Sequence, residues 1–343
     1  MEIKKKTFRY WIKLYCYNNN TILYIKRNIT NKYLCGLLLL ICLPFFLINA
    51  ISTILYENLY GAKRIERLIL KDNGKTFKYE LAIVAIAKNE GPYIKEWIEY
   101  HKLVGVDKFY FYDNESNDST QQFLSPYIKN GIVDYTFIKG TSKQLYAYND
   151  AIKKHKQEVR LMAFIDLDEY IMPTQPYKSI AVIIKEIINN AHKGAVGVGI
   201  NWAIYGSSGY IEKQNGLITQ TFLKRASNNH WGNSHIKVIC NPRFIKKYIS
   251  PHYPLLIKGA YCVNENTYQR IWGWGADNII YQNIRINHYF TKSKQEYINK
   301  QNRGLADRKG QYNMSNFYQY DLNDIYDDSM KAYSKDLQII NQS

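Results

Sequence analysis

The stretch "LAIVAIAKNEGPYIKEWIEYHKLVGVDKFYFYD", residues 81–113, sets the expected fold. Residues 81–87 form a continuous apolar run, which is typical of a parallel strand that is buried on both faces. Residues 90–105 carry apolar and aromatic side chains at helical spacing, and Pro92 suits a first helical turn. A second strand-like run follows at residues 108–112. The stretch therefore predicts a strand, a helix and a second parallel strand in succession.

The same alternation continues toward the middle of the chain. It predicts a helix near 118–127, a strand at 132–138, a helix at 142–155 and a strand at 161–165. Consecutive strand–helix units favour an α/β fold with a doubly wound, mostly parallel sheet. No G-x-G-x-x-G motif follows the first strand, which argues against a dinucleotide-binding Rossmann site.

Polar residues follow each of the four predicted strands. In open α/β sheets, ligands bind at the carboxyl ends of the strands, so these residues are expected to meet at one edge. The four clusters are Lys88-Asn89-Glu90, Asp113-Asn114-Glu115, Lys139-Gly140 and Asp166-Leu167-Asp168-Glu169.

The last cluster lies in "LMAFIDLDEYIMP", residues 161–173. Its spacers Leu167 and Tyr170 favour burial, and buried carboxylates are paired, protonated or bound to a metal. Mg²⁺ and Mn²⁺ prefer oxygen ligands, often carboxylates together with substrate phosphates. The motif is therefore either a structural turn or a metal–diphosphate site, and the neighbouring polar clusters favour the metal site.

The charge of the chain favours an anionic partner. The 343 residues carry a formal net charge of +17, which suits nucleic acid, phospholipid or a phosphorylated small molecule. Neither a zinc-finger spacing nor an RNA-binding aromatic motif occurs, which argues against nucleic acid. The five cysteines form no C-x-x-C pair and leave the redox compartment open.

The N-terminal region predicts membrane attachment. Residues 1–32 hold eight basic residues and one acidic residue, and the uncharged residues 33–56 are long enough to cross a bilayer. We expect a basic cytoplasmic segment at 1–32, a single transmembrane anchor at 33–56, which tolerates Pro44, and a stem at 57–80. A buried core helix, or a hairpin that enters one leaflet, is the alternative for 33–56.

Several motifs together resemble glycosyltransferase family 92 and its bacterial relatives, which are similar to family 2 enzymes of the GT-A fold. Residues 82–120 and "FIDLDEYI" at 164–171 carry the resemblance first. Further matching stretches are "NWAIYGSSGY" at 201–210, "HIKVICNP" at 235–242, "PHYP" at 251–254 and "IRINHYFTKSKQEYINKQNRG" at 284–304. The resemblance implies a GT-A domain at 81–305, followed by a C-terminal tail at 306–343.

The resemblance implies transfer of a sugar from a nucleotide-diphosphate donor, expected to be a UDP-sugar, to a hydroxyl of a glycan or glycolipid. Inversion at the anomeric carbon and a role in surface polysaccharide synthesis are implied as well. A Mn²⁺ or Mg²⁺ ion would stabilise the departing diphosphate. The alternatives are a non-catalytic membrane-bound protein that binds nucleotide sugars or glycans, and a metal-dependent nucleotidyltransferase, which would need more acids for a two-metal site.

Site residues follow from the matched motifs. Asp166, Asp168 and His288 are the expected metal ligands, and Glu169 is a catalytic candidate that would orient them. An ion pair with a nearby Lys or Arg is the alternative for Glu169. The expected donor-binding residues are Asn89, Glu90, Asp113, Gln144, Asn149 and Asp166. Turn formation or helix capping is the alternative for Asn89 and Asp113.

The stretch "RIWGWGADN", residues 270–278, is the expected acceptor side. Trp272 and Trp274 would stack on sugar rings, and the stretch is similar to an acceptor-side segment of β-1,4-galactosyltransferases. In those enzymes acids follow directly, whereas here only Asp277 follows. Asp277 is the first candidate for the base that an inverting transfer needs, with Glu265 a weaker one. Core tryptophans and a turn acid are the alternative.

The expected location is the bacterial inner membrane, with a Golgi type II membrane protein as the alternative. The Lys, Asn, Ile and Tyr bias and the short stem favour a bacterial surface-polysaccharide enzyme. Glycans on the sequons that begin at Asn114 and Asn117 would block the expected donor site, which disfavours a lumenal setting.

Overall fold

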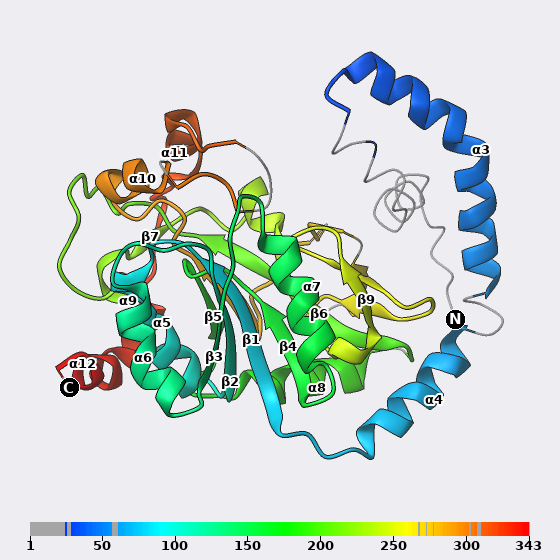
Figure 1. Ribbon diagram of the computed structural model, residues 1–343, viewed down its shortest axis with the longest axis horizontal. Helices are drawn as coiled ribbons and strands as arrows, with labels where there is room; N and C mark the ends of the chain where they lie inside the picture. The colour runs from blue at the N-terminus through cyan, green and yellow to red at the C-terminus, as the bar shows by residue number, and fades with distance from the viewer. Residues whose placement is uncertain are drawn as a thin grey trace.

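The computed structural model describes residues 25, 29–56, 61–191, 193–266, 268–271, 273–276, 278–301, 303–306 and 310–342. A large mixed sheet forms the centre of the molecule, and helices cover both of its faces (Figure 1). The helix α3 (Lys32–Tyr56) stands beside this body, and α4 (Ala62–Asn73) leads from it toward the first strand (Figure 1).

The central sheet has ten strands. Eight of them run in the order β12-β11-β6-β8-β4-β1-β2-β3, and β13 pairs with both β5 and β6. The strands are β1 (Tyr79–Ala87), β2 (Lys108–Asp113), β3 (Val133–Phe137), β4 (Val159–Phe164), β5 (Glu169–Pro173), β6 (Ala195–Ile204), β8 (Ile236–Cys240), β11 (Tyr261–Val263), β12 (Arg270–Ile271) and β13 (Ile284–His288). The neighbours β4, β1, β2 and β3 are parallel, as the sequence predicts. In contrast, β8 runs antiparallel between β4 and β6.

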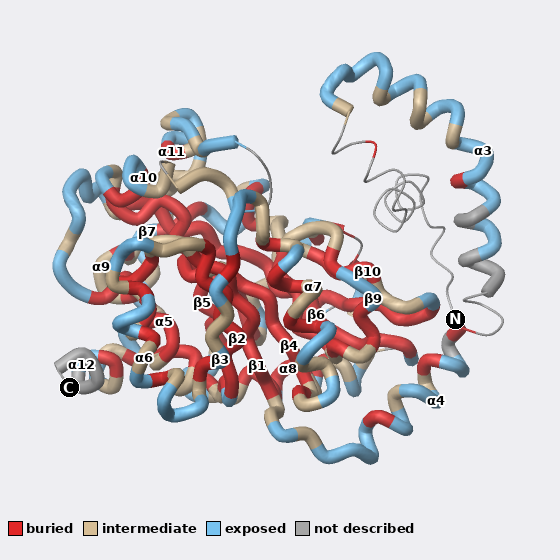
Figure 2. Tube along the Cα trace, viewed as in Figure 1, coloured by how far each residue is buried: buried red, intermediate tan, exposed pale blue. Residues whose placement is uncertain are grey.

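Successive residues of β1 face opposite layers, because side chains alternate along a strand. Ile83 and Ala85 pack in the core that includes the inner faces of α5 (Gly91–Leu103), α6 (Thr120–Lys129) and α8 (Ile180–Asn190). Val84 and Ile86 pack on the other side with α7 (Gln144–His155). Figure 2 shows the strands buried along most of their length. The mixed α/β class with a mostly parallel sheet is thus confirmed.

Shorter elements complete the fold. They are α9 (Ile218–Thr221), β7 (Lys224–Arg225), η2 (Trp231–Ser234), η3 (Pro242–Phe244), β9 (Ile245–Tyr248), β10 (Pro254–Leu256), α10 (Lys294–Gln301), α11 (Met314–Tyr320), β14 (Ile325–Tyr326), η4 (Ser329–Tyr333) and α12 (Ser334–Gln342).

The helix α3 spans the residues for which the sequence predicted a transmembrane anchor. Many of its apolar side chains are exposed, including Leu40, Phe45 and Ile48. Within the described part of the chain, however, no helix combines the length and the apolar character that crossing a bilayer requires. The predicted anchor at 33–56 is therefore not confirmed.

The helix α4 packs on the sheet domain. Its Ile65 is fully buried in a small cluster with Val196, Phe244 and Ala260. Asp72 accepts two hydrogen bonds from the Arg243 guanidinium, from Nε at 2.6 Å and from Nη2 at 2.8 Å. Such bidentate pairs fix geometry as well as charge.

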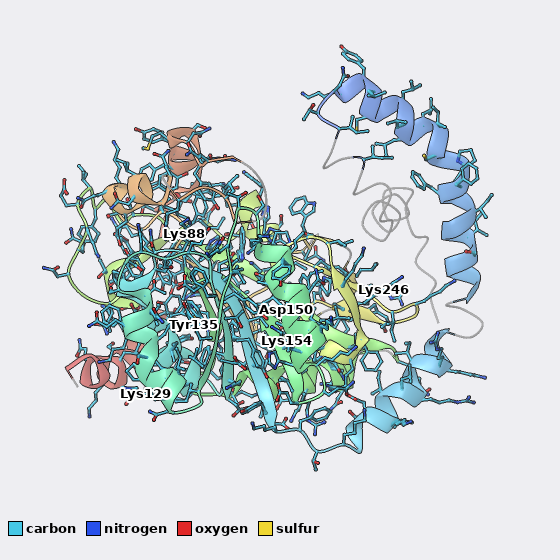
Figure 3. All side chains as sticks on the ribbon, in the orientation of Figure 1. Lys88, Lys129, Tyr135, Asp150, Lys154 and Lys246 are labelled. Atoms are coloured by element: carbon cyan, nitrogen blue, oxygen red, sulfur yellow. The ribbon has the colours of Figure 1, made fainter. Side chains whose placement is uncertain are left out.

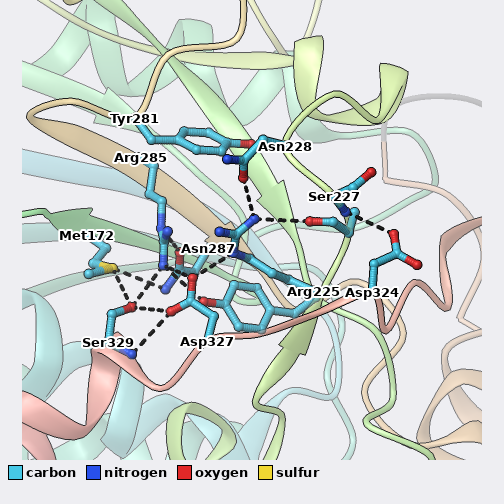
Figure 4. Close-up of polar contacts among 12 residues, drawn as sticks. Met172, Arg225, Ser227, Asn228, Tyr281, Arg285, Asn287, Asp324, Asp327 and Ser329 are labelled. Carbon is cyan, nitrogen blue, oxygen red and sulfur yellow. Dashed lines mark hydrogen bonds and ion pairs between the residues drawn. The ribbon is translucent and has the colours of Figure 1, made fainter.

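The C-terminal segment returns across the sheet and is held by a buried ion cluster (Figure 4). Asp327 Oδ2 accepts from Arg225 Nε at 2.6 Å and from Arg285 Nη2 at 2.8 Å. Arg285 also donates to Tyr205 and Ser329. One carboxylate thus ties β7 and β13 to the segment that contains β14 and η4.

Candidate active site

A cavity of about 550 Å³ opens at the carboxyl ends of the parallel strands. Its walls come from the ends of β1, β2, β4, β6 and β13, from the start of α7 and from residues after α10. In Figure 3, Lys88 marks this edge, directly after β1, and Lys129 at the end of α6 marks the opposite edge. The strand-end clusters predicted to meet do meet here, since Lys88, Glu115, Gly140 and Asp166 all line the cavity.

Asp168 lies in the cavity wall between two nitrogen groups. Lys300 Nζ donates to its Oδ2 at 2.6 Å, and His288 Nε2 lies 3.6 Å from its Oδ1. Burial raises the pKa of Asp168, but the positive charge of Lys300 outweighs burial and holds that pKa well below its usual range. Asp168 is therefore a carboxylate at neutral pH.

Asp166 lies beside it at the end of β4. Gln144 Nε2 donates to Asp166 Oδ1 at 2.7 Å, and Lys237 Nζ donates to Oδ2 at 2.9 Å. Lys237 is only 1% exposed and reaches the site from β8. Because β8 runs antiparallel, its first residues lie at the same edge as the last residues of β4.

Glu169 is buried beneath the acidic turn rather than in the cavity wall. Its Oε2 accepts from the Asp166 backbone N–H at 2.9 Å and lies 3.4 Å from Lys237 Nζ. Burial raises the pKa of Glu169 above its usual range. The proximity of Lys237 matches the predicted alternative of a Lys or Arg partner, and the backbone hydrogen bond shows that Glu169 also shapes the turn.

Glu90 also lines the cavity, at the start of α5. The guanidinium of Arg303 donates to Glu90 and, from Nη1, to the carbonyl oxygens of Lys88 at 2.9 Å and Asn89 at 3.1 Å. Lys292 Nζ lies 3.4 Å from the other oxygen of Glu90. Arg303 thus joins the turn after β1 to the segment that follows α10.

Three predicted donor-binding residues face the protein instead of the cavity. Asn89 accepts from the Asn117 N–H at 2.8 Å and has a positive φ of 55° in its turn. Asp113 accepts from the Ser116 N–H at 2.9 Å and from the Tyr135 hydroxyl at 2.8 Å. Asn149 exchanges hydrogen bonds with the backbone of Tyr248. The turn-forming alternative describes Asn89 and Asp113 well.

The predicted acceptor side is described in part. Trp272 and Asp277 lie outside the described residues. Trp274 is 38% exposed, and its ring centroid lies 4.6 Å from that of His235. Glu265 caps the turn before β13, where it accepts from the N–H groups of Gln282 and Asn283.

The donor set fits a divalent ion that shares its coordination with a substrate. Asp168 and His288 offer a carboxylate oxygen and an imidazole nitrogen on one wall, which suits Mn²⁺. Burial lowers the pKa of His288, which keeps the ring neutral and its lone pair available. Among the described residues, no group of three or more His, Cys, Asp or Glu side chains is placed to hold an ion, so phosphate oxygens would complete the shell.

The described cavity wall is balanced in formal charge. Its four basic residues are Lys88, Lys237, Lys300 and Arg303, and its four acidic residues are Glu90, Glu115, Asp166 and Asp168. A diphosphate alone would tip this balance toward negative charge. A diphosphate that enters with a divalent cation would leave the balance close to neutral, which supports a metal–diphosphate pair as the ligand.

Residue patterns alone did not single out Lys237, Lys300 or Arg303 as site residues. Lys237 lies in "HIKVICNP", and the other two lie in the long stretch from 284 to 304. The signal available was a basic residue in a matched motif, but only the antiparallel course of β8 and the position of α10 bring these cations to the acids.

A sequence model of glycosyltransferase family 92 matches residues 87–338, which is more than half of the chain. The chain belongs to glycosyltransferase family 92. The resemblance seen in the motifs is therefore confirmed.

Individual relatives match over shorter stretches. A family 92 protein of Arabidopsis thaliana is 28% identical over 152 residues, which cover 43% of this chain and 24% of that protein. A family 92 protein of Ricinus communis is 28% identical over 112 residues, which cover 32% of this chain and 18% of that protein. The chain thus spans about a quarter or less of the length of these relatives.

Among solved structures, TarS residues 1–349 of S. aureus in complex with UDP resembles part of the chain. The identity is 15% and the TM-score is 0.33, with 48% of this chain and 47% of TarS covered. The structural similarity thus extends over about half of each chain.

Proposed function

We propose that this family 92 member transfers a sugar from a nucleotide-diphosphate donor, a UDP-sugar in the first place, to a hydroxyl of a glycan or glycolipid. The observation that carries the proposal is the acid–cation cluster of Asp166, Asp168, Lys237 and Lys300 in a cavity at the carboxyl edge of the sheet. A departing diphosphate develops negative charge, and fixed cations at this edge stabilise it.

Different regions of the cavity would hold different parts of the donor. The ends of β2 and β3, with Asn114, Glu115 and Gly140, offer polar groups for the base and ribose. Lys300 and Arg303 also line the cavity and would contact the diphosphate. A Mn²⁺ or Mg²⁺ ion held by Asp168 and His288 would supply Lewis-acid stabilisation of the leaving group. Asp166, whose two oxygens already accept from Gln144 and Lys237, would hold the ribose or a metal-bound water.

UDP release tests this proposal. Purified protein incubated with Mn²⁺ and each of UDP-glucose, UDP-galactose and UDP-N-acetylglucosamine is expected to release UDP from at least one donor. Asp168→Ala is expected to lose this release by at least a hundredfold while its circular dichroism stays native. The matched control is Asp134→Ala, which removes an exposed acid on β3.

Two outcomes count against the proposal. Wild-type protein that binds UDP-sugars without releasing UDP would favour a binding protein. If Asp168→Ala releases UDP at the wild-type rate, the acidic motif takes no part in the reaction.

We further propose that the protein works at a bacterial inner membrane, where its N-terminal basic segment would meet anionic lipid. The support is the excess of Lys and Arg in residues 1–32 and the exposed apolar side chains of α3. Fractionation of expressing cells, with salt and detergent extraction, tests this location.

A further inference from the structure

Transfer to a hydroxyl requires a group that accepts the hydroxyl proton. Each carboxylate in the described cavity wall already holds a partner. Asp166 accepts from Lys237, Asp168 from Lys300 and Glu90 from Arg303. Glu115 accepts from the Gly140 N–H at 2.9 Å. These carboxylates are committed to hydrogen bonds or ion pairs.

His252 lines the same cavity and differs from those acids. Its Nδ1 lies 3.0 Å from the carbonyl oxygen of Ile236, an atom that can only accept. Nδ1 therefore carries the proton, and Nε2 carries the lone pair. Within the described part of the chain, the hydrogen bond of the His252 ring is the one made by Nδ1, and Nε2 makes none.

Trp202 lies beside His252 and also lines the cavity. The two ring centroids are 5.2 Å apart in an edge-to-face arrangement. The buried indole N–H of Trp202 has no hydrogen-bond partner among the described residues. An indole N–H donor next to an imidazole acceptor suits a hydroxyl, which accepts one hydrogen bond and donates another.

A row of aromatic rings leads from this pair to the surface. His235 stacks on Trp202 at 4.8 Å and lies 5.4 Å from His252. On its other side, His235 contacts Trp274 at 4.6 Å and Trp231 at 5.8 Å. Trp274 and Trp231 are 38% and 50% exposed. Exposed tryptophans that continue into the cavity offer apolar faces on which a sugar acceptor can stack.

We propose that Nε2 of His252 is the general base that takes the proton of the acceptor hydroxyl. This inference rests on the proposed glycosyl transfer. As the acceptor O–H gives its proton to Nε2, its oxygen forms the new bond to the anomeric carbon. The bond from that carbon to the diphosphate oxygen breaks, and its electron pair leaves with the diphosphate. The imidazolium of His252 then returns the proton to solvent.

The surroundings of His252 keep it in the accepting form. Burial lowers its pKa well below the usual value, and the Lys237 charge adds to this effect. His235 and His288 also face His252 and lower its pKa, whereas the hydrogen bond to Ile236 raises it. The ring is therefore neutral at pH 7 before substrate binds.

The test compares His252→Gln with His155→Gln, which changes a histidine on α7 outside the cavity wall. The readouts are UDP affinity by calorimetry, and kcat for the best UDP-sugar with water and with a panel of free monosaccharides as acceptors. We expect UDP affinity within about twofold of wild type and a fall in kcat of about 10²- to 10⁴-fold. We also expect the acid limb of the pH–kcat profile to disappear. His155→Gln is expected to keep the wild-type kcat and the wild-type pH–kcat profile.

Each result decides the inference. A kcat within about threefold of wild type overturns it, and so does a UDP affinity that falls together with kcat, which would indicate a structural role. Should His252→Gln unfold, His252→Asn is read by the same criteria. Wild-type protein that turns over no UDP-sugar overturns the proposed function and this inference together, whereas turnover unchanged in His252→Gln overturns only the inference.

Discussion

The Nζ atom of Lys300 lies 2.6 Å from Oδ2 of Asp168, and both side chains are largely buried in the cavity wall. Removal of one partner of a buried ion pair leaves the other charge without compensation. Lys300→Met is therefore expected to lower the free energy of unfolding by about 3–5 kcal/mol in the absence of metal, as measured by chemical denaturation.

The same variant reports on the metal. If Asp168 is a ligand, Mn²⁺ replaces the missing ammonium, and Mn²⁺ raises the melting temperature of Lys300→Met by more than that of wild type. Lys294→Met, on the same helix, provides the control. An equal response to Mn²⁺ in all three proteins would contradict a metal role for Asp168.

The ion cluster of Asp327 with Arg225 and Arg285 is sensitive to acid. Burial raises its pKa, but the Arg285 charge and hydrogen bonds from Ser329 and Arg225 outweigh burial and leave the pKa below its usual range. A lowered folded-state pKa contributes stability that is present above the unfolded-state pKa of about 3.9 and is lost as pH falls through the folded-state value. Asp327→Asn is expected to cost about 3–5 kcal/mol at pH 7 and progressively less below pH 4.

Urea unfolding of wild type and Asp327→Asn at pH 7 and pH 3 measures this difference. The neighbouring Asp328 pairs with Lys331 on the surface, where both side chains are 49% exposed. Asp328→Asn should therefore change stability little at either pH. A deficit in Asp327→Asn that is the same at both pH values would show that the charge of Asp327 is not the source of its contribution.

Gly197 of β6 lies directly opposite Cys240 of the neighbouring strand β8. A Cβ there would lie 2.3 Å from Cys240 Cβ and 2.8 Å from the Ile239 carbonyl oxygen, so the backbone of β8 would have to move. At Gly199 the near atoms are the flexible Cδ1 ends of Ile271 and Ile236. Gly197→Ala is expected to lose more than the roughly 1–3 kcal/mol of ordinary overpacking, and Gly199→Ala to fall within that range. Thermal unfolding of both variants ranks them, and the reverse order would contradict the packing argument.

The helix α4 is expected to belong to the stable unit. A chain shortened to begin at Gly61 keeps Ile65 and Asp72, whereas one that begins at Tyr79 exposes the surface under Ile65 and leaves Arg243 without its carboxylate. The second chain is expected to be less stable by at least about 3 kcal/mol, in chemical denaturation. Asp72→Asn in the longer chain isolates the ion pair. Equal stability of the two shortened chains would place the start of the folded domain near residue 81, as the sequence predicted.

Local patterns were sufficient for the parallel half of the sheet. The apolar run at 81–87 and the helical spacing at 90–105 correspond to β1 and α5, because each pattern is satisfied by burial within its own element. The polar residues after these strands lie at one edge because the carboxyl ends of neighbouring parallel strands share an edge. The antiparallel strand β8 was not foreseen, since "IKVIC" gives no sign of direction or neighbours.

The site was predictable where one motif contains the residues. Asp166 and Asp168 line the cavity beside His288, as expected from the motifs. Lys237, His252 and Lys300 reach it from segments far apart in the chain, and their roles depend on pairings that no single stretch encodes. Asn89, Asp113 and Asn149 have suitable polar groups, but backbone N–H groups of the protein itself already bind them.

The reversed direction of β8 has a consequence for how such proteins diversify. The connection from the end of β6 at Ile204 to the start of β8 at Ile236 begins and ends at the rim of the cavity. The connection contains β7, which pairs with β14, but insertions on either side of β7 would alter the rim of the cavity and leave the register of the central sheet unchanged. A homologue with a different acceptor preference is therefore expected to differ in these stretches first, with the strand-end residues around Asp166 and Asp168 unchanged.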